Sequence, residues 1–401
     1  MNDKVPLTDL EDLVNAQGYL GSTPPHGRAP SRGERFWVDR PAQLQQAVNI
    51  LKQASVVAVD AEFMQVRSRV PHEAGSNVPR LSLLQLAIAN QCFIIDALRI
   101  QDLSPLTRVV GNPDIAVLLH GAGADMRVMA ERGLLVVHYY DLEATCRSIF
   151  GQHESSLAAM LQRAFGIHLD KSLQRTDWTR RPLPPAMIAY AARDAEVTLS
   201  LYHWLDTYFH SILQLHEVTG QPEQVAIWIE PFLKGNPSIS PEMAVAEAKS
   251  LGIVHNRAQI VADCRMALAN IKHPMHRSRL LRLIADLSLA QLVPDLLPLL
   301  QAETSDERSA SARALGRLGA KSAIEAISQL LRDPVLDVRK AAQTALKNLL
   351  AKDVRHRRET TPKTAADGTR SWVVENPQDK GNDDTDWKSQ LRSFLDPHDA
   401  H

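Results

Sequence analysis

The stretch of sequence that decides the fold is Val56-Val57-Ala58-Val59-Asp60-Ala61-Glu62-Phe63. Its first four residues, mostly β-branched valines, predict a buried strand. Side chains alternate between the two faces of a strand, so we expect the carboxylates of Asp60 and Glu62 to point the same way. Two neighbouring anions favour a cation between them, and carboxylate oxygens suit magnesium or manganese. A solvated strand end with two unrelated acids is the alternative at this point.

Two further acidic motifs follow along the chain. Residues 115–125 predict a strand, a turn of small residues and the first turn of a helix that contains Asp125. The positive end of that helix favours an ionised carboxylate. Residues 184–206 predict a helix that begins at two prolines, and on it Tyr190 and Asp194 share one face because they are four residues apart. Each motif alone is also compatible with an ordinary exposed acid, but together they offer four acids and a phenol.

This set of motifs resembles the DEDDy family of 3′–5′ exonucleases and, within it, the ribonuclease D branch. The likeness extends roughly from Phe36 to Tyr208, and a tyrosine four residues before the last aspartate marks the tyrosine subclass. The motifs that carry it are Asp60-Ala61-Glu62, Leu83-Leu84-Gln85-Leu86, Leu119 to Met126, Leu169 to Leu183, and Tyr190 to Asp194. The resemblance implies an α/β fold of the ribonuclease H-like 3′–5′ exonuclease type, with a mixed sheet flanked by helices.

The same resemblance implies a metal-dependent 3′–5′ exoribonuclease that releases nucleoside 5′-monophosphates, with structured RNA such as tRNA precursors as its substrate. Two divalent ions, Mg²⁺ or Mn²⁺, would serve as cofactors. By this resemblance Asp60 would bridge both ions, Glu62 and Asp194 would hold the ion that activates water, and Asp125 would hold the second. Tyr190 would orient the attacking water, because a phenol with a pKa of about 10 positions water better than it deprotonates it.

The resemblance also suggests contacts to the nucleic acid. The side chains expected to bind substrate are Phe63, His120, Lys171, Arg175 and Arg181. The net charge of −1 gives no overall attraction to nucleic acid, so any basic contact must be local. For the basic residues of this set, an ordinary solvated face is the alternative. The resemblance favours RNA, and a DNA 3′–5′ exonuclease with the same chemistry is the alternative.

A different interpretation of residues 121–123, Gly-Ala-Gly, is a dinucleotide-binding turn between a strand and a helix. That motif requires a third small residue, and Met126 occupies the position. We therefore expect these glycines to form a tight turn beside Asp125.

The 401 residues favour two domains with tails. Clusters of glycine and proline and a change to alanine- and leucine-rich sequence mark the boundaries. The expected segments are a flexible N-terminal segment at 1–34, the exonuclease domain at 35–215, a linker at 216–240, HEAT-like helical repeats at 241–352 and a disordered tail at 353–401.

The helical part repeats with a period of 31 residues, as the spacing of Arg277, Arg308 and Arg339 shows. The segment 333–342 is similar to a short HEAT repeat, and such helix pairs stack into a solenoid. Ribonuclease D itself usually carries helical HRDC domains at this place. The solenoid could bind RNA, bind a protein partner, or pair its basic residues with its own acids. Its candidate basic residues are Arg257, Arg265, Lys272, Arg277, Arg279 and Arg282. A non-catalytic scaffold that binds nucleic acid is the alternative of another class.

Cysteine use and hydropathy indicate the compartment. Three cysteines show neither metal-ligand spacing nor a disulfide framework, which suits a reducing environment. No apolar run is long enough to span a bilayer, and the N-terminus lacks the apolar core of a signal peptide. We expect a cytoplasmic protein without a membrane partner.

Overall fold

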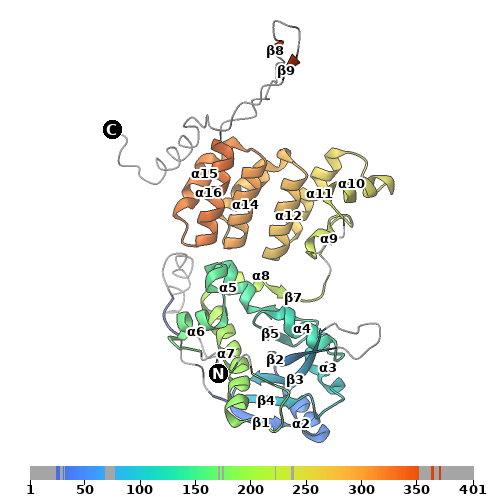
Figure 1. Ribbon diagram of the computed structural model, residues 1–401, viewed down its shortest axis with the longest axis vertical. Coiled ribbons are helices and arrows are strands. Elements are labelled where there is room, and N and C mark those ends of the chain that lie inside the picture. The colour runs from blue at the N-terminus through green and yellow to red at the C-terminus, as the bar shows by residue number, and fades with distance from the viewer. Residues whose placement is uncertain are drawn as a thin grey trace, which may run out of the picture. The chain divides into compact units, whose positions relative to one another are not determined.

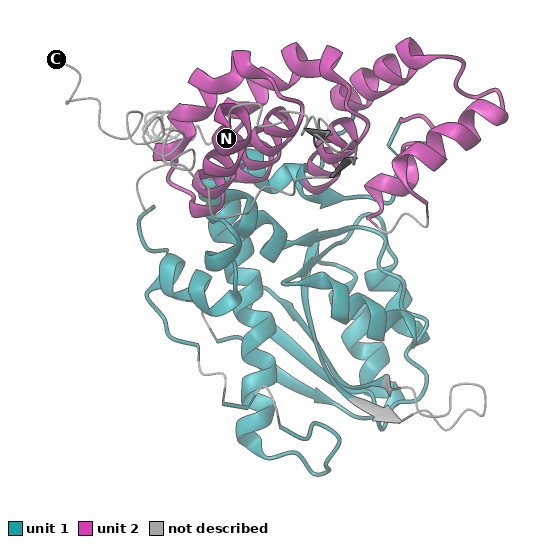
Figure 2. Cartoon of the chain, turned by 45° about the horizontal axis from the view of Figure 1, so that its top comes forward, with its two compact units in different colours: residues 1–224, 271–274 teal, residues 225–270, 275–401 magenta. Residues whose placement is uncertain are grey.

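The computed structural model describes residues 24–27, 30, 32–67, 77–169, 172–173, 176–221, 223–235, 239–351, 363–364 and 370–371. The chain divides into two compact units, residues 1–224 with 271–274 and residues 225–270 with 275–401 (Figure 2). Most of the expected N-terminal segment and of the expected tail lies outside the described residues. Residues 363–364 and 370–371 form a short antiparallel pair, β8 and β9.

The first unit is built on a mixed sheet of seven strands in its described part (Figure 1). The strand order is β1-β4-β3-β2-β5-β6-β7. The strands are β1 Glu34–Val38, β2 Val56–Arg67, β3 Asn77–Ile88, β4 Gln91–Asp96, β5 Ala116–Leu119, β6 Tyr139–Asp141 and β7 Glu217–Val218. β2 is central, antiparallel to β3 and parallel to β5. The predicted mixed α/β sheet is therefore confirmed, and the valine run forms its buried middle strand.

Helices cover both faces of this sheet. On the face of Val57 and Val59 the core includes residues of α2 Pro41–Leu51, the 3₁₀ turn Ser104–Leu106, α3 Thr107–Val110 and α4 Ala122–Ala130. On the face of Ala58 it includes residues of α5 Leu142–Phe150, α6 Leu157–Phe165, α7 Pro185–Tyr208 and α8 His210–Leu215. A second 3₁₀ turn, Gln152–Glu154, joins α5 to α6. Because strand side chains alternate, Asp60 and Glu62 belong to the face that α7 covers.

The pairing of β2 with β3 shifts by one residue beside the acids. Glu62 pairs with Leu83, whereas Phe63 pairs with Leu81, so Ser82 is an extra residue in β3. Such a bulge bends the strand and turns its side chains locally. The irregularity lies directly next to Glu62.

The second unit is helical. Its helices are α9 Glu230–Leu233, α10 Pro241–Ser250, α11 Arg257–Asn270, α12 Pro274–Asp286, α13 Val293–Leu296, α14 Ser305–Arg317, α15 Ile324–Gln329 and α16 Leu336–Leu350. Three-residue 3₁₀ turns at 290–292, 321–323 and 330–332 and a longer one at 297–301 join them. A Cβ atom on Gly316 would lie 2.7 Å from Cα of Ala345, so glycine permits the close approach of α14 and α16.

Two arginines of the 31-residue period, Arg308 and Arg339, occupy equivalent places, whereas Arg277 donates to the carbonyl of residue 268. Arg308 donates to the carbonyls of residues 302 and 303, and Arg339 donates to those of residues 333 and 334. Arg308 also forms a buried, two-bond pair with Asp333 at 2.8 and 3.2 Å. Arg308 and Arg339 thus each fasten their helix to the turn that precedes it. In the described part of the chain, none of the helices has the length and apolar character needed to cross a membrane.

Candidate active site

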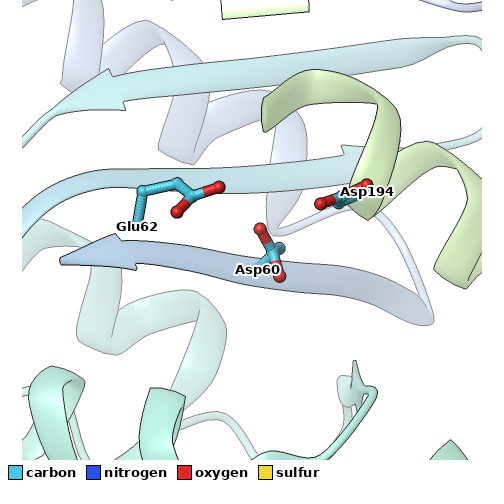
Figure 3. Close-up of side chains that lie close together, drawn as sticks. All are labelled: Asp60, Glu62 and Asp194. Atoms are coloured by element: carbon cyan, nitrogen blue, oxygen red, sulfur yellow. The ribbon is translucent and has the colours of Figure 1, made fainter. Parts of the chain in front are cut away.

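Three carboxylates converge between the middle of the sheet and α7. Asp60 and Glu62 come from β2, Asp194 comes from α7, and Figure 3 shows their side chains pointing toward one another. One oxygen of each carboxylate lies within 4.8 Å of the others. The strand provides two of these acids on one face, and the packing of α7 on that face provides the third.

A partly buried ion pair fixes α7 against the sheet close to these acids. Arg35 of β1 donates from Nε and Nη2 to the two carboxylate oxygens of Glu196, both at 2.8 Å. Glu196 is buried and lies two residues after Asp194. Paired guanidinium–carboxylate bonds of this kind fix direction as well as distance. The pair therefore restrains the part of α7 that carries Asp194.

Asp125 lies in the first turn of α4 and is buried. The turn before this helix is held by Asp141, whose carboxylate accepts from the amides of Gly121 at 3.0 Å and Ala122 at 3.3 Å. Gly121 has a φ of +80°, and a Cβ atom there would lie 2.8 Å from Oε2 of Glu143. Only glycine adopts this left-handed conformation without strain. The turn thus sets the direction in which α4 presents Asp125.

Burial and nearby negative charges disfavour the ionised forms of Asp60, Glu62 and Asp125. Burial, and then the charges of Asp125, Asp194 and Glu62, raise the pKa of Asp60 well above its usual range. Burial, followed by Asp194 and Asp125, raises the pKa of Glu62 to about 8. Burial and the charge of Asp141 raise the pKa of Asp125 to about 7. The charge of Asp125 therefore acts on Asp60 and Glu62, although Asp125 lies outside the group of three carboxylates within 4.8 Å of one another.

This arrangement fits a divalent cation. Hard oxygen ligands that repel one another when ionised are the ligand type of Mg²⁺ and Mn²⁺. Gln85 supplies a second observation, because it pairs across the sheet with Asp60 and its side chain is fully buried. Neither polar atom of its carboxamide has a hydrogen-bond partner among the described residues. Burying such a group without a partner costs about 1–3 kcal/mol, and a hydrated ion at Asp60 would bring water within its reach.

Tyr190 lies on α7 one turn before Asp194 and is half-buried. Its phenol hydrogen-bonds Asp194, and burial together with the charges of Asp194 and Glu62 raises its pKa. The phenol is therefore protonated at neutral pH and can donate a hydrogen bond. Its ring packs beside that of Trp178, with 6.0 Å between the ring centroids.

Two of the residues predicted to bind substrate, Phe63 and His120, lie among the described residues and do not carry a basic charge near pH 7. Phe63 is half-buried and packs against the core on the other face of the sheet from Asp60. Nε2 of His120 lies 3.0 Å from the carbonyl oxygen of Ser155, and burial lowers the pKa of the imidazole. His120 is thus neutral near pH 7 and donates a hydrogen bond to the backbone. A contact of either residue with substrate stays a prediction.

Of the three basic residues predicted to bind substrate, the structure describes Arg181. Lys171 and Arg175 lie outside the described residues. Arg181 is described, and its guanidinium bonds the carboxylate of Asp96 and several protein oxygens around Trp178. Sequence reasoning did not identify Asp96, whose only signal was an acid at the end of an apolar strand. It also did not identify Gln85 as a neighbour of Asp60, although a polar residue within an apolar run was a signal.

The basic residues of the helical unit are largely engaged within that unit. Arg265 pairs with Asp295, and Arg277 pairs with Glu307. Further donors reach backbone carbonyls, from Arg257 to residues 287 and 288 and from Arg279 to residue 233. Pairing with the unit's own acids, one of the three interpretations of this surface, therefore applies to Arg265 and Arg277, and binding of RNA or of a protein partner stays a prediction.

A part of each unit matches a known family. Residues 36–208 match the 3′–5′ exonuclease family, and residues 265–347 match HEAT repeats. The first match covers the strands and helices that carry all four acids and Tyr190. Residues 36–208 are thus a 3′–5′ exonuclease domain with ribonuclease D and RRP6 homologues, as the sequence motifs predicted.

Curated relatives match over this domain. Ribonuclease D of Haemophilus influenzae is 32% identical over 184 residues, which are 46% of this chain and 42% of that protein. Exosome complex exonuclease RRP6 of Saccharomyces cerevisiae is 30% identical over 172 residues, which are 42% of this chain and 22% of that protein. The chain therefore spans less than half the length of these relatives. Among solved structures, the catalytic core of RRP6 from Trypanosoma brucei is 20% identical with a TM-score of 0.41, covering 87% of this chain and 89% of that one.

Proposed function

We propose that this chain is a divalent-metal-dependent 3′–5′ exoribonuclease. The observation that carries the proposal is the convergence of Asp60, Glu62 and Asp194 within 4.8 Å inside a 3′–5′ exonuclease domain. The raised pKa values of Glu62 and Asp125 support it, because strongly perturbed carboxylates gathered in one place are typical of functional sites. RNA is the proposed substrate because relatives of this domain are named as ribonuclease D and as an exosome exonuclease.

The family resemblance implies a role for each of these residues, and the proximity of the acids supports it. Asp60, Glu62 and Asp194 would hold divalent metal, with Asp125 as a further ligand. Two such ions, when bound, supply an activated water and stabilise charge on the leaving oxygen. The protonated phenol of Tyr190 would hold the attacking water by a hydrogen bond and fix its orientation. Removal of one residue at a time from the 3′ end would release nucleoside 5′-monophosphates, and 3′ ends of tRNA precursors or other structured RNA are the proposed physiological class.

The test is a time course on 5′-labelled RNA and DNA oligonucleotides of the same sequence, with Mn²⁺ or Mg²⁺ and with an EDTA control. We expect a ladder that shortens by single nucleotides from the 3′ end, faster on RNA and abolished by EDTA. Asp60→Asn should remove the ladder while leaving the fold intact. Cleavage that survives EDTA or Asp60→Asn would contradict the proposal.

Two other outcomes of the same time course would support a different function. A ladder that forms faster on DNA would identify a deoxyribonuclease with the same chemistry. Absence of a ladder with either metal would favour the non-catalytic scaffold, in which the exonuclease domain only binds nucleic acid beside the HEAT repeats.

A further inference from the structure

The geometry points to Arg181 as a positioning residue of the active site, which holds Tyr190 and Glu62 in place through Trp178 and Ser82. This assignment rests on the proposed function for its catalytic consequence. In this assignment Arg181 positions active-site residues instead of binding the phosphates of the substrate. Asp96 contributes by holding the guanidinium of Arg181.

The guanidinium of Arg181 is occupied by the protein itself. Nε donates to Oδ2 of Asp96 at 2.7 Å and Nη2 donates to Oδ1 at 2.8 Å, so the pair has two parallel bonds. Asp96 is fully buried at the end of β4, where Oδ1 also accepts from the amides of residues 98 and 99. The Arg181 side chain is 17% exposed. A carboxylate this deeply buried needs its cation, because removing one partner of such a pair leaves an uncompensated buried charge.

The same guanidinium reaches the bulge beside Glu62. Nη2 of Arg181 lies 3.2 Å from the carbonyl oxygen and 3.1 Å from the hydroxyl oxygen of Ser82, and donates to both. Ser82 is the extra residue of β3, next to Leu83, which pairs with Glu62. Because the bulge interrupts the regular ladder there, the local direction of the strand depends on these added bonds.

The third group of contacts leads to Tyr190. Nη1 of Arg181 donates to the carbonyl oxygen of Trp178 at 2.9 Å, and the hydroxyl of Ser82 donates to the same oxygen. Trp178 is 1% exposed, and its ring lies 6.0 Å from the ring of Tyr190 at an angle of 36°. The position of one aromatic ring in such a pair constrains that of the other. Arg181 therefore fixes Trp178 by its backbone, and Trp178 limits where the phenol can lie.

Lysine is the informative replacement at this position. It keeps the positive charge beside Asp96, but its single ammonium group cannot reproduce a planar fork that bonds Asp96, Ser82 and Trp178 together. Arg181→Lys should therefore retain the ion pair and the fold while loosening the ring of Trp178. Arg180→Lys is the matched control, because Arg180 is the neighbouring residue and its side chain is exposed.

The experiment measures kcat and KM of the wild-type protein and of both lysine variants on a 5′-labelled RNA, at several salt concentrations. For Arg181→Lys we expect kcat to fall at least tenfold, with KM and its salt dependence within twofold of the original. Arg180→Lys should change neither. A rise in KM with kcat preserved would overturn the assignment and indicate a phosphate contact instead.

A second readout does not depend on activity. The chain has 6 tryptophans, so 5-fluorotryptophan labelling gives a resolvable ¹⁹F spectrum in which Trp178→Phe identifies the signal of Trp178. Arg181→Lys should shift or broaden that signal in the metal-free protein, and Arg180→Lys should not. Ser82→Ala, which keeps the ion pair, should move it in the same direction by a smaller amount.

These two readouts separate the two proposals. If the wild-type protein gives no ladder, the proposed function fails, yet the ¹⁹F spectra still test whether Arg181 positions Trp178. If Arg181→Lys leaves both kcat and the Trp178 signal unchanged in an active enzyme, Arg181 is no positioning residue.

Discussion

Replacing Glu62 by glutamine should stabilise the metal-free protein, and it should do so only above a certain pH. Burial and the charges of Asp194 and Asp125 raise the pKa of Glu62 from an ordinary 4.5 to about 8 in the folded chain. Between these two pH values the folded protein keeps a proton that the unfolded chain has lost. The stability of the folded state therefore falls as the pH rises through this window and is constant above it. Glutamine cannot ionise, so the variant escapes this loss.

The size of the effect follows from the shift. One pKa unit corresponds to about 1.4 kcal/mol, so a fully expressed shift would amount to roughly 5 kcal/mol. The Glu62 side chain is half-buried, and solvent screens part of the repulsion. We expect Glu62→Gln to exceed the original protein in free energy of unfolding by about 2 kcal/mol at pH 8.5 and by less than about 0.5 kcal/mol at pH 4.5.

The assay is urea unfolding of the full chain in EDTA at intervals from pH 4.5 to 9. Glu34→Gln is the control, because Glu34 is exposed at the start of β1, and its difference from the original protein should stay small throughout. A Glu62→Gln variant that is less stable than the original at pH 8.5, or a difference that does not change with pH, would refute the reasoning about mutual repulsion of the acids.

Three further predictions concern the metal, the turn before α4 and the repeats. Mn²⁺ should raise the unfolding temperature more at pH 8.5 than at pH 6, since the carboxylates must lose their protons to bind it; calorimetry should also record proton release, and equal shifts at both pH values would argue against a carboxylate site. Gly121→Ala should cost about 1–2 kcal/mol because of its positive φ, whereas Gly123→Ala, inside α4 and with nothing within 4 Å of the new methyl, should be neutral or stabilising by up to about 1 kcal/mol; thermal unfolding should show a lower unfolding temperature for Gly121→Ala and an equal or higher one for Gly123→Ala. Arg308→Met should destabilise the helical unit by about 3–5 kcal/mol because it leaves a buried carboxylate uncompensated, and adding Asp333→Asn should recover part of that loss; no recovery in the double variant would show that the pair is not the cause.

Local periodicity alone determined several features. Alternation along β2 put Asp60 and Glu62 on one face, because the side-chain period of a strand does not depend on what packs against it. Helical spacing likewise put Tyr190 one turn from Asp194. The repeat of 31 residues determined the helical unit, because each helix pair needs the next to bury its apolar face.

Only the tertiary structure decided how these local features meet. The distance between the acids of β2 and Asp194 depends on how α7 lies on the sheet, which the pairing of Arg35 with Glu196 over 161 residues restrains. The spacing of charged residues in a sequence does not distinguish a buried ion pair from a solvated one. Arg181 therefore had the pattern of a substrate contact, and its pairing with Asp96, 85 residues earlier, became visible only once the chain had brought the two together. The raised pKa values have the same origin, because burial and mutual repulsion exist only after residues far apart in sequence share one site.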